Sequence, residues 1–321
     1  MMKEVTKFLK ENNIKDKTVL AAVSGGVDSC VLFYILNSLK KEFSLDLKVI
    51  HLNHNWRGEE SLKDLEFVQN LADEAGCGFY TKTLEDDVKK TELEARDARY
   101  DFFEEALNKF NSDVCFLAHN KNDNVETLIY RVIKGTGVSG LSSIPKIRHP
   151  YYRPLLDFSR MEIEKFAKKH NILFREDKSN SDTKYKRNFI RQNILPQMQQ
   201  INDTVLNSIS SLIRLASENT EIIDDYMADV EKKIFEKNSE SWHYKRPTII
   251  REEFLKLKPA LQREILSRYF KGILKNRDFK NILKIQNFIV DNEDSILSVN
   301  TDTFLKVWKG TVFLYRKDNR G

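Results

Sequence analysis

The sequence is poor in cysteine, and no stretch of it is apolar and long enough to span a bilayer. Cys30, Cys77 and Cys115 are its three cysteines; they lie far apart and form no Cys-x-x-Cys pair. This pattern excludes a zinc ribbon and a cysteine-held iron–sulfur cluster, and it predicts three reduced, mostly buried thiols. The N-terminal segment also lacks an apolar signal core. We therefore expect a soluble, cytoplasmic protein without a membrane partner.

Strong net charge, repeats and low-complexity segments are lacking as well. The 53 basic and 48 acidic residues leave a formal net charge of +5. This mild excess permits nucleic-acid binding but does not demonstrate it. Hydrophobic residues make up 40% and aromatic residues 11% of the 321 residues, which is enough for packed cores. The length predicts two domains.

Short apolar stretches alternate with helical patterns through the first 200 residues. Strands are expected at 18–23, 47–52, 78–84 and 114–118, and helices at 29–40, 61–75, 92–110 and 125–133. This order predicts an α/β domain over residues 1–200, with a doubly wound, mostly parallel sheet covered by helices on both sides. Polar residues follow three of the strands, where ligands bind in such sheets: Ser24, Asn53 and His119.

The pattern changes after residue 200. One long helix is expected at 205–234, a polar stretch at 236–246, and helices at 254–273 and 280–289. Three short alternating runs at 296–299, 303–307 and 311–315 predict a terminal β-meander. Residues 201–321 are therefore predicted to form a smaller, mainly helical domain.

A glycine pair lies between the first predicted strand and its helix. Glycines let the backbone approach a ligand closely, and the N–H groups at a helix start favour an anion such as the phosphates of ATP. An acidic side chain there implies an intervening Mg²⁺, and the missing Walker lysine excludes a GxxxxGK(S/T) loop. An ordinary strand–turn–helix is the structural alternative. The predicted ATP contacts of this loop are Ser24, Gly25, Gly26, Val27, Asp28 and Ser29.

Further motifs follow the loop in a fixed order. They are HLNH at 51–54, RGEES at 57–61, EARDARYDFF at 94–103, HNKNDNVET at 119–127, RPLL at 153–156, EDKSN at 176–180 and RNFIR at 187–191. Together with the loop they resemble the tRNA(Ile)-lysidine synthetase family of the PP-loop ATP pyrophosphatase superfamily, over residues 18 to 196. The resemblance implies an adenine nucleotide alpha hydrolase-like fold.

The resemblance also implies an activity. Members of the family are ligases that use ATP to join free L-lysine to C2 of cytidine 34 in the CAU anticodon of tRNA(Ile). The reaction passes through an O2-adenylated intermediate, releases AMP and pyrophosphate, and changes the codon that is read from AUG to AUA. The lysine amine has a pKa of about 10.4, so a positioned carboxylate must help to deprotonate it.

Roles for single residues follow from the resemblance and from their chemistry. We expect Asp28 to hold Mg²⁺ on ATP, and Asp123 and Glu126 to bind lysine, with Asp123 as the proton acceptor. We expect negative charge on phosphate, adenylate or pyrophosphate to be stabilised by Arg99, His119 and Arg191. Two further ATP contacts are expected at His51 and Asn53. The expected tRNA contacts are His54, Arg57, Lys184, Lys186 and Arg187.

Each assignment has a purely structural alternative, such as a helix cap for Asp28 or a surface ion pair for Arg191. Asn122 also departs from the family, most of whose members have aspartate there. Three other functions stay open: cytidine thiolation, which usually needs Cys-x-x-Cys pairs, an amidotransferase-type nucleotide synthetase, and tRNA binding without catalysis. A homodimer is left open too.

Overall fold

The structure is a computed structural model of the chain. It describes residues 1–55, 58–84, 92–175, 186–240, 246–274 and 279–316. The chain forms two compact units, Met1–Glu218 and Asn219–Gly321. The sequence pattern places the boundary at residue 200, whereas the compact units divide inside helix α9 (Val205–Ile234).

The first unit is built around a six-stranded sheet in the order β3-β2-β1-β4-β6-β5. Its strands are β1 (Thr18–Ala22), β2 (Asp46–Asn53), β3 (Gly78–Thr83), β4 (Cys115–Phe116), β5 (Ile147–Arg148) and β6 (Tyr151–Tyr152). All neighbouring strands run parallel except β5 and β6. The chain changes direction across the sheet between β1 and β4, so the carboxyl ends of these two strands flank the switch point where ligands bind.

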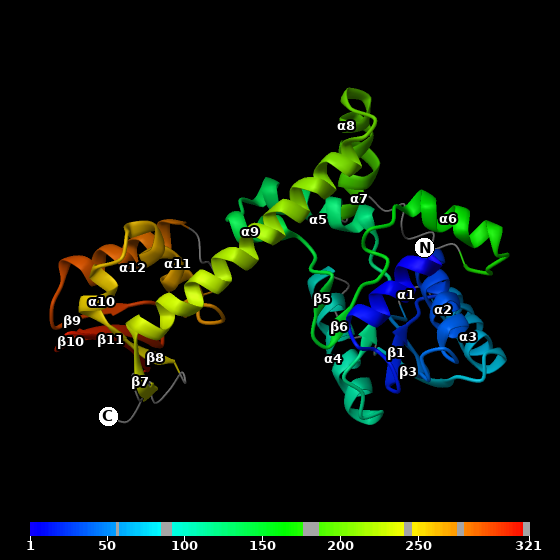
Figure 1. The fold of residues 1–321 in the computed structure, drawn as a ribbon, viewed down its shortest axis with the longest axis horizontal. Helices are drawn as coiled ribbons and strands as arrows, with labels where there is room; N and C mark the ends of the chain where they lie inside the picture. The colour runs from blue at the N-terminus through cyan, green and yellow to red at the C-terminus, as the bar shows by residue number, and fades with distance from the viewer. Residues whose placement is uncertain (56–57, 85–91, 176–185, 241–245, 275–278, 317–321) are drawn as a thin grey trace. The chain divides into compact units, whose positions relative to one another are not determined.

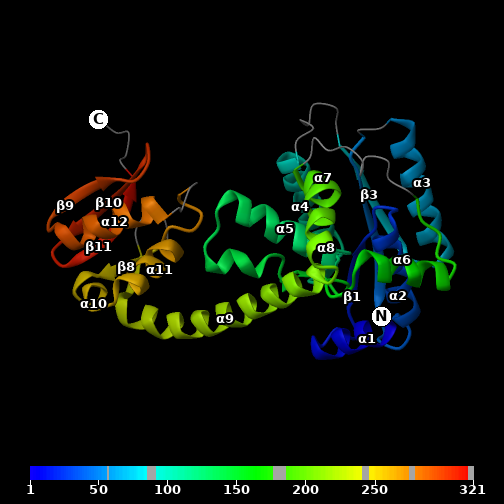
Figure 2. The same ribbon diagram turned by 90° about the horizontal axis from the view of Figure 1, so that it is seen from above.

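Helices cover both faces of this sheet, which confirms the predicted doubly wound fold (Figures 1 and 2). Alternate residues of β1 point to opposite faces: Val19 and Ala21 pack with α1, α2, α3 and α6, and Leu20 packs with α4. The helices are α1 (Met2–Glu11), α2 (Val27–Leu39), α3 (Glu59–Glu74), α4 (Glu92–Lys109), α5 (Lys121–Lys134), α6 (Arg160–Lys169), α7 (Lys186–Phe189) and α8 (Leu195–Ile201). A 3₁₀ turn (Val138–Ser142) follows α5, and a π-helical turn (Ile190–Ile194) joins α7 to α8.

Two helix starts differ from the sequence-based expectation because of capping. Helix α5 begins at Lys121, earlier than predicted, since the Asn120 side chain accepts the Asp123 N–H and Asp123 accepts the Asn120 N–H in return. Helix α6 was not predicted, and Ser159 and Glu162 form the same reciprocal box at its start. Both boxes have the polar-x-x-acid spacing that marks a helix start, so the sequence carried the signal.

The second unit contains more sheet than predicted. Its strands β7 (Phe235–Glu240), β8 (Pro247–Ile250), β9 (Ser295–Ser298), β10 (Thr303–Trp308) and β11 (Thr311–Arg316) form a sheet in the order β7-β8-β11-β10-β9. The predicted meander β9-β10-β11 is confirmed, but β7 falls where a polar stretch was expected and β8 directly follows that stretch. The expected helix at 254–273 is two, α10 (Arg251–Leu255) and α11 (Pro259–Tyr269), because Pro259 starts a new helix. Helix α12 (Phe279–Asp291) completes the core.

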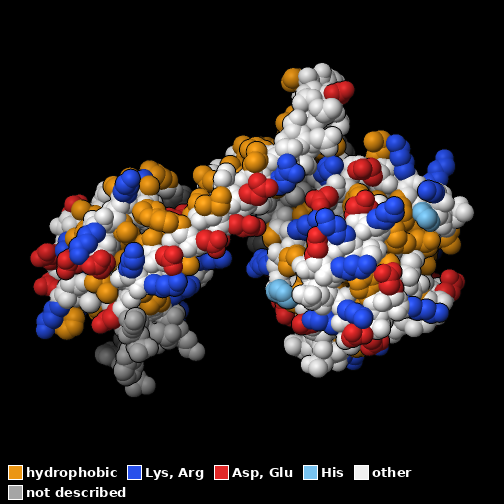
Figure 3. Space-filling view, in the orientation of Figure 1, with side chains coloured by type: hydrophobic (Ala, Val, Ile, Leu, Met, Phe, Trp, Pro, Cys, Tyr) orange, Lys and Arg blue, Asp and Glu red, His pale blue; other side chains and the backbone are white. Residues whose placement is uncertain are grey.

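Acidic and basic side chains are interspersed on the face drawn in Figure 3, in keeping with the small net charge. Across the described ranges, no helix combines the length and the apolar character needed to cross a bilayer.

Candidate active site

The loop after β1 is held in shape by its own serines. Ser29 Oγ donates to the Gly26 carbonyl at 2.8 Å and accepts the Ser24 N–H at 3.1 Å, so the Ser29 hydroxyl serves the loop itself. Gly25 has φ +92°, a conformation that favours glycine. Helix α2 begins at Val27, and its first N–H groups have no acceptor within the helix. This loop therefore has backbone donors that an anion could accept.

A segment far along the chain anchors this loop. The Arg175 N–H donates to the Gly25 carbonyl at 2.9 Å. The Arg175 guanidinium bonds to Asp64, and to Glu60 Oε2 at 2.8 Å, both on α3. Helix α3 itself lies against the loop, because a Cβ built on Gly25 would meet Phe67 at 3.7 Å. Arg175 thus ties the loop to α3, a contact that the sequence motifs did not reveal.

Asp28, in the first turn of α2, is hydrogen-bonded on both oxygens. Its Oδ1 accepts from Asn120 Nδ2 at 3.2 Å, and its Oδ2 is 2.6 Å from Arg160 Nη1. Burial raises the pKa of the Asp28 carboxyl, and Arg160 opposes that rise. In the described part of the chain no three His, Cys, Asp or Glu side chains gather as a metal site. A divalent cation at Asp28 would therefore need phosphate oxygens among its ligands, as Mg²⁺ commonly has.

Two carboxylates on α5 share one arginine. Arg191 forms a fork with Glu126, with Nε 2.7 Å from Oε1 and Nη2 2.9 Å from Oε2, and Nη2 is 3.2 Å from Asp123 Oδ1. Burial raises the pKa of both carboxyls. Glu126 is 1% exposed and Asp123 is 26% exposed, so Asp123 is the carboxylate that a ligand can reach. The π-helical turn at 190–194 places Arg191 here, and such turns are frequent at functional sites.

Asn120 joins these two groups. Its side-chain Nδ2 donates to Asp28 Oδ1, while its side-chain Oδ1 accepts the Asp123 N–H. The predicted residues Asp28, Asp123, Glu126 and Arg191 thus form one hydrogen-bonded network, which we call the acid–arginine network. Asn120 and Arg160 complete it. The sequence analysis missed both, although the spacing of Asn120 and Asp123 signals a cap.

A second group of predicted residues gathers around His119. Burial lowers the pKa of His119 to about 3, and the nearby charges of Arg153, Arg99, Arg187 and Arg96 lower it further. His54 has a pKa lowered to about 4 by burial and by Arg99. The charge of Arg99 thus acts on both His54 and His119, and that of Arg187 acts on His119. Four arginines around a neutral histidine form a site suited to phosphate oxygens.

Arg153 is the buried member of this arginine group. It is 3% exposed, and it donates to the Pro145 carbonyl at 3.0 Å and to the Tyr100 hydroxyl at 3.3 Å. Burial lowers its pKa. Two buried nitrogens, Arg153 Nε and His119 Nδ1, have no hydrogen-bond partner in the described part of the structure. Arg153 lies in the RPLL motif, which the sequence analysis quoted without giving it a role.

The remaining predicted residues lie in several places. His51 is 4% exposed, and its Nδ1 donates to the Val23 carbonyl at 2.8 Å, which links the ends of β1 and β2. Asn53 is buried, and its Oδ1 accepts the Asn55 N–H at 2.8 Å. Lys186 is exposed on α7. Arg57 and Lys184 lie outside the described residues.

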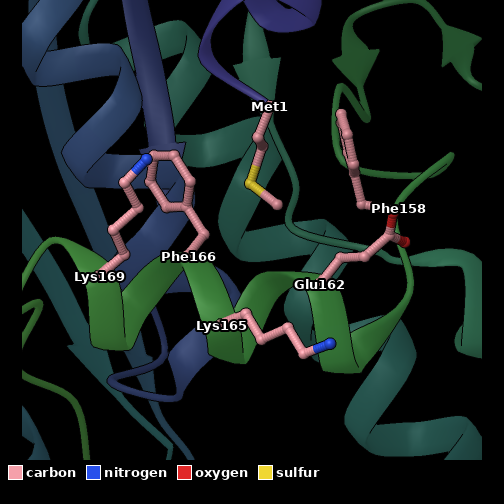
Figure 4. Close-up of a pocket in the computed structure, with 6 residues that line it drawn as sticks. All are labelled: Met1, Phe158, Glu162, Lys165, Phe166 and Lys169. Carbon is pink, nitrogen blue, oxygen red and sulfur yellow. The ribbon is translucent and has the colours of Figure 1, made fainter.

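The cavity in Figure 4, of about 230 Å³, lies elsewhere, between the N-terminus and α6. Its lining residues are Met1, Phe158, Glu162, Lys165, Phe166 and Lys169. None of these is a predicted site residue, and the cavity has no part in the chemistry considered below.

The low pKa of His119 predicts acid sensitivity. The unfolded chain takes up a proton near pH 6.5, and the folded chain does so only near the lowered value. The free energy of unfolding must therefore fall as pH drops below 6.5. His119→Gln should lessen this fall, by up to roughly 1.4 kcal/mol per pH unit. Urea unfolding at pH 7 and pH 5 measures it, with the exposed His149→Gln as control. Equal pH slopes in His119→Gln and the wild type would contradict this origin.

The anchoring by Arg175 predicts a binding defect. Arg175→Ala should weaken ATP binding by about three- to tenfold, because it frees the loop from α3 while leaving every predicted ATP contact in place. Calorimetric titration with α,β-methylene-ATP measures the change. Arg214→Ala, which removes the exposed pair with Glu218 on α9, is the matched control. Unchanged affinity in Arg175→Ala would show that the loop holds its shape unaided.

Known proteins are similar to this chain in sequence and in fold. Residues 1–198 match the PP-loop domain family. A tRNA(Ile)-lysidine synthase from Clostridioides difficile (strain 630) is 33% identical over 94% of this chain and 65% of its own length. One from Thermotoga maritima is 36% identical over 68% of this chain and 54% of its own length. The chain thus spans about half to two thirds of these curated relatives.

Among solved structures, a U34-tRNA thiolase from Methanococcus maripaludis with a 4Fe–4S cluster is similar in fold. The TM-score is 0.56 at 18% identity, and the match covers 67% of this chain and 77% of the thiolase. At this identity the likeness extends to the fold alone. The matched family, the glycine loop after β1 and the parallel sheet agree with one another: the chain belongs to the PP-loop family.

Proposed function

We propose that this chain uses ATP to join free L-lysine to C2 of cytidine 34 in the CAU anticodon of tRNA(Ile). The shared name of the relatives supports this function. One observation in the structure carries it: Asn120 bonds to Asp28 beside the ATP loop and to Asp123 beside Arg191. An activating nucleotide and an amine can therefore be bound within one site.

The first step activates the cytidine. Cytosine C2 is a poor electrophile because its oxygen is a bad leaving group. Attack of O2 on the α-phosphorus of ATP releases pyrophosphate and converts that oxygen into part of AMP, which leaves readily. The backbone donors of the Gly25 loop hold phosphate oxygens, and Asp28 with its oxygen donors fits a Mg²⁺ that would offset the phosphate charge when bound. His119, Arg99 and Arg153 are placed to stabilise negative charge that develops on the phosphate.

The second step needs a neutral amine. Asp123 is the reachable carboxylate, and we assign to it the lysine ammonium and its proton. The nitrogen then attacks C2, the C2–O2 bond breaks, and AMP departs. Both oxygens of Glu126 are occupied by Arg191, so we assign Glu126 to positioning Arg191 instead of contacting lysine. This revises the sequence-based expectation that Glu126 binds lysine together with Asp123.

Binding of tRNA is assigned to basic groups beside this site and to the second unit. The charge of Arg187 lowers the pKa of Asp123, Glu126 and His119, so it acts on the acid–arginine network and on His119 as well. With Lys186 and His54 it forms the expected contact with the anticodon loop. Residues 219–321 are proposed to bind tRNA as a separate unit.

Thiolation is the less favoured function. Cys30, Cys77 and Cys115 are all buried and unpaired by disulfide bonds, and burial raises the pKa of each thiol. A buried thiol of raised pKa is a poor nucleophile and a poor cluster ligand. Asn122 likewise does not indicate lost catalysis, because it accepts the Arg160 N–H at 3.0 Å while Asp28, Asp123 and Glu126 keep their contacts.

The proposal predicts lysine-dependent pyrophosphate release. The chain is mixed with ATP, Mg²⁺ and unmodified tRNA(Ile) bearing CAU, with and without lysine, and the anticodon nucleosides are analysed by mass spectrometry. Without lysine the first step stops once each chain holds one adenylated tRNA, so continued pyrophosphate release and a lysine adduct of cytidine 34 are expected only when lysine is present. Asp123→Asn should lower the rate of adduct formation by at least about 100-fold, in the range of a lost general base.

One control variant and two further outcomes distinguish the alternative functions. Lys7→Ala, which removes the exposed pair with Glu11 on α1, should leave turnover unchanged. Turnover that ignores lysine but needs sulfide or ammonia would move the chain to a neighbouring PP-loop activity. Tight tRNA binding without any pyrophosphate release would replace the proposal with a binding function.

A further inference from the structure

Arg160 is the first residue of α6 and the only guanidinium hydrogen-bonded to Asp28 among the described residues. Its Nη1 is 2.6 Å from Asp28 Oδ2, and Asp28 is 19% exposed while Arg160 is 41% exposed. This oxygen belongs to the carboxylate that we assign to Mg²⁺. Arg160 therefore holds a positive charge against one oxygen of the carboxylate that would hold a metal.

Two contacts besides the ion pair fix Arg160 in this place. Its backbone N–H donates to Asn122 Oδ1 at 3.0 Å, and its Nε donates to Glu164 Oε1 at 2.7 Å. The amide accepts the N–H at the start of α6 without adding a carboxylate next to the guanidinium. An uncharged acceptor thus leaves Asp28 as the inner partner of Arg160 and the exposed Glu164 as its outer one.

The charge around Asp28 makes this cation important. Asp123 lies close enough to raise the pKa of Asp28, while Arg160 and Arg191 lower it. Without Arg160, no guanidinium among the described residues would be hydrogen-bonded to Asp28, and two carboxylates would face the incoming phosphates. Repulsion of ATP by Asp28 would then depend more strongly on a metal to offset it.

We propose that Arg160 is the resident counter-cation of Asp28, which neutralises this carboxylate in the absence of metal and competes with Mg²⁺ for Oδ2. It follows that Arg160 sets how strongly ATP binding depends on Mg²⁺ in this chain. The inference rests on the ATP-binding role of Asp28 in the proposed function, but it requires neither lysine nor tRNA.

The test is a titration of Mg²⁺ at a fixed concentration of α,β-methylene-ATP, with nucleotide binding followed by calorimetry. Arg160→Gln should lower the half-saturating Mg²⁺ concentration by about three- to tenfold, because the metal no longer displaces a guanidinium. The same variant should bind the metal-free nucleotide more weakly than the wild type. Identical Mg²⁺ dependence in both proteins would overturn the proposal and leave Arg160 as a structural tether of α6.

Three variants control this test. Arg160→Lys keeps the charge and should behave as the wild type; if it behaves as Arg160→Gln, charge is not the cause and the proposal fails. Glu164→Gln removes only the outer partner and should change the half-saturating Mg²⁺ by less than about twofold. Asn122→Asp keeps the acceptor and adds a competing carboxylate, so it should shift the titration in the direction of Arg160→Gln even if the latter folds poorly.

Failure of this titration is distinct from failure of the ligase. A chain without lysine-dependent turnover can still give the expected Mg²⁺ shift. Absence of any Mg²⁺-dependent nucleotide binding by the wild type would overturn the competition and the role of Asp28 together.

Discussion

The ion pair between Arg191 and Glu126 is the interaction on which the rest of the site depends. Glu126 is 1% exposed, and a buried carboxylate keeps its charge only if hydrogen-bonded cations surround it. Removing one partner of such a pair commonly costs about 3–5 kcal/mol, because the other charge is left uncompensated. The fork from Arg191 to Glu126 therefore fixes the guanidinium, and the fixed guanidinium holds Asp123 at the accessible edge.

Folding and site assembly are linked through one helix start. Asn120 and Asp123 cap α5, and the same two side chains contact Asp28 and Arg191. A cap typically contributes about 1 kcal/mol to stability. Here it also sets the distance between the loop after β1 and the carboxylates of α5, so a change at Asn120 would disturb stability and site geometry together. The two roles are carried by the same two side chains.

Sequence patterns were sufficient for the elements with clear periodicity. Helix α9 has the predicted bounds, and the β9-β10-β11 meander was predicted within two residues at each end, because both carry strong local signals. Strands β5 and β6 have two residues each, too few for any periodicity to appear. Strands β7 and β8 are polar or short, so only the pairing of β8 with β11 and of β7 with β8 identifies them.

The residues of the candidate site also divide into those that the sequence indicated and those that it did not. Motifs indicated Asp28, Asp123, Glu126 and Arg191 because their spacing resembles a known family. Arg160, Arg175 and Asn120 could not be recognised from spacing alone, since each acts through a partner more than 90 positions away: Asp28 for Asn120 and Arg160, and Asp64 for Arg175. The different exposure of Asp123 and Glu126 is likewise a product of tertiary packing.

Binding of L-lysine compared with L-norleucine, which lacks only the terminal amine, tests the assigned role of the acid–arginine network most directly. Calorimetric titration of the chain loaded with α,β-methylene-ATP should show saturable lysine binding. Norleucine should bind at least about 100-fold more weakly, because it offers Asp123 no ammonium group with which to pair. Equal affinity for the two amino acids would contradict the role of Asp123 in holding the amine.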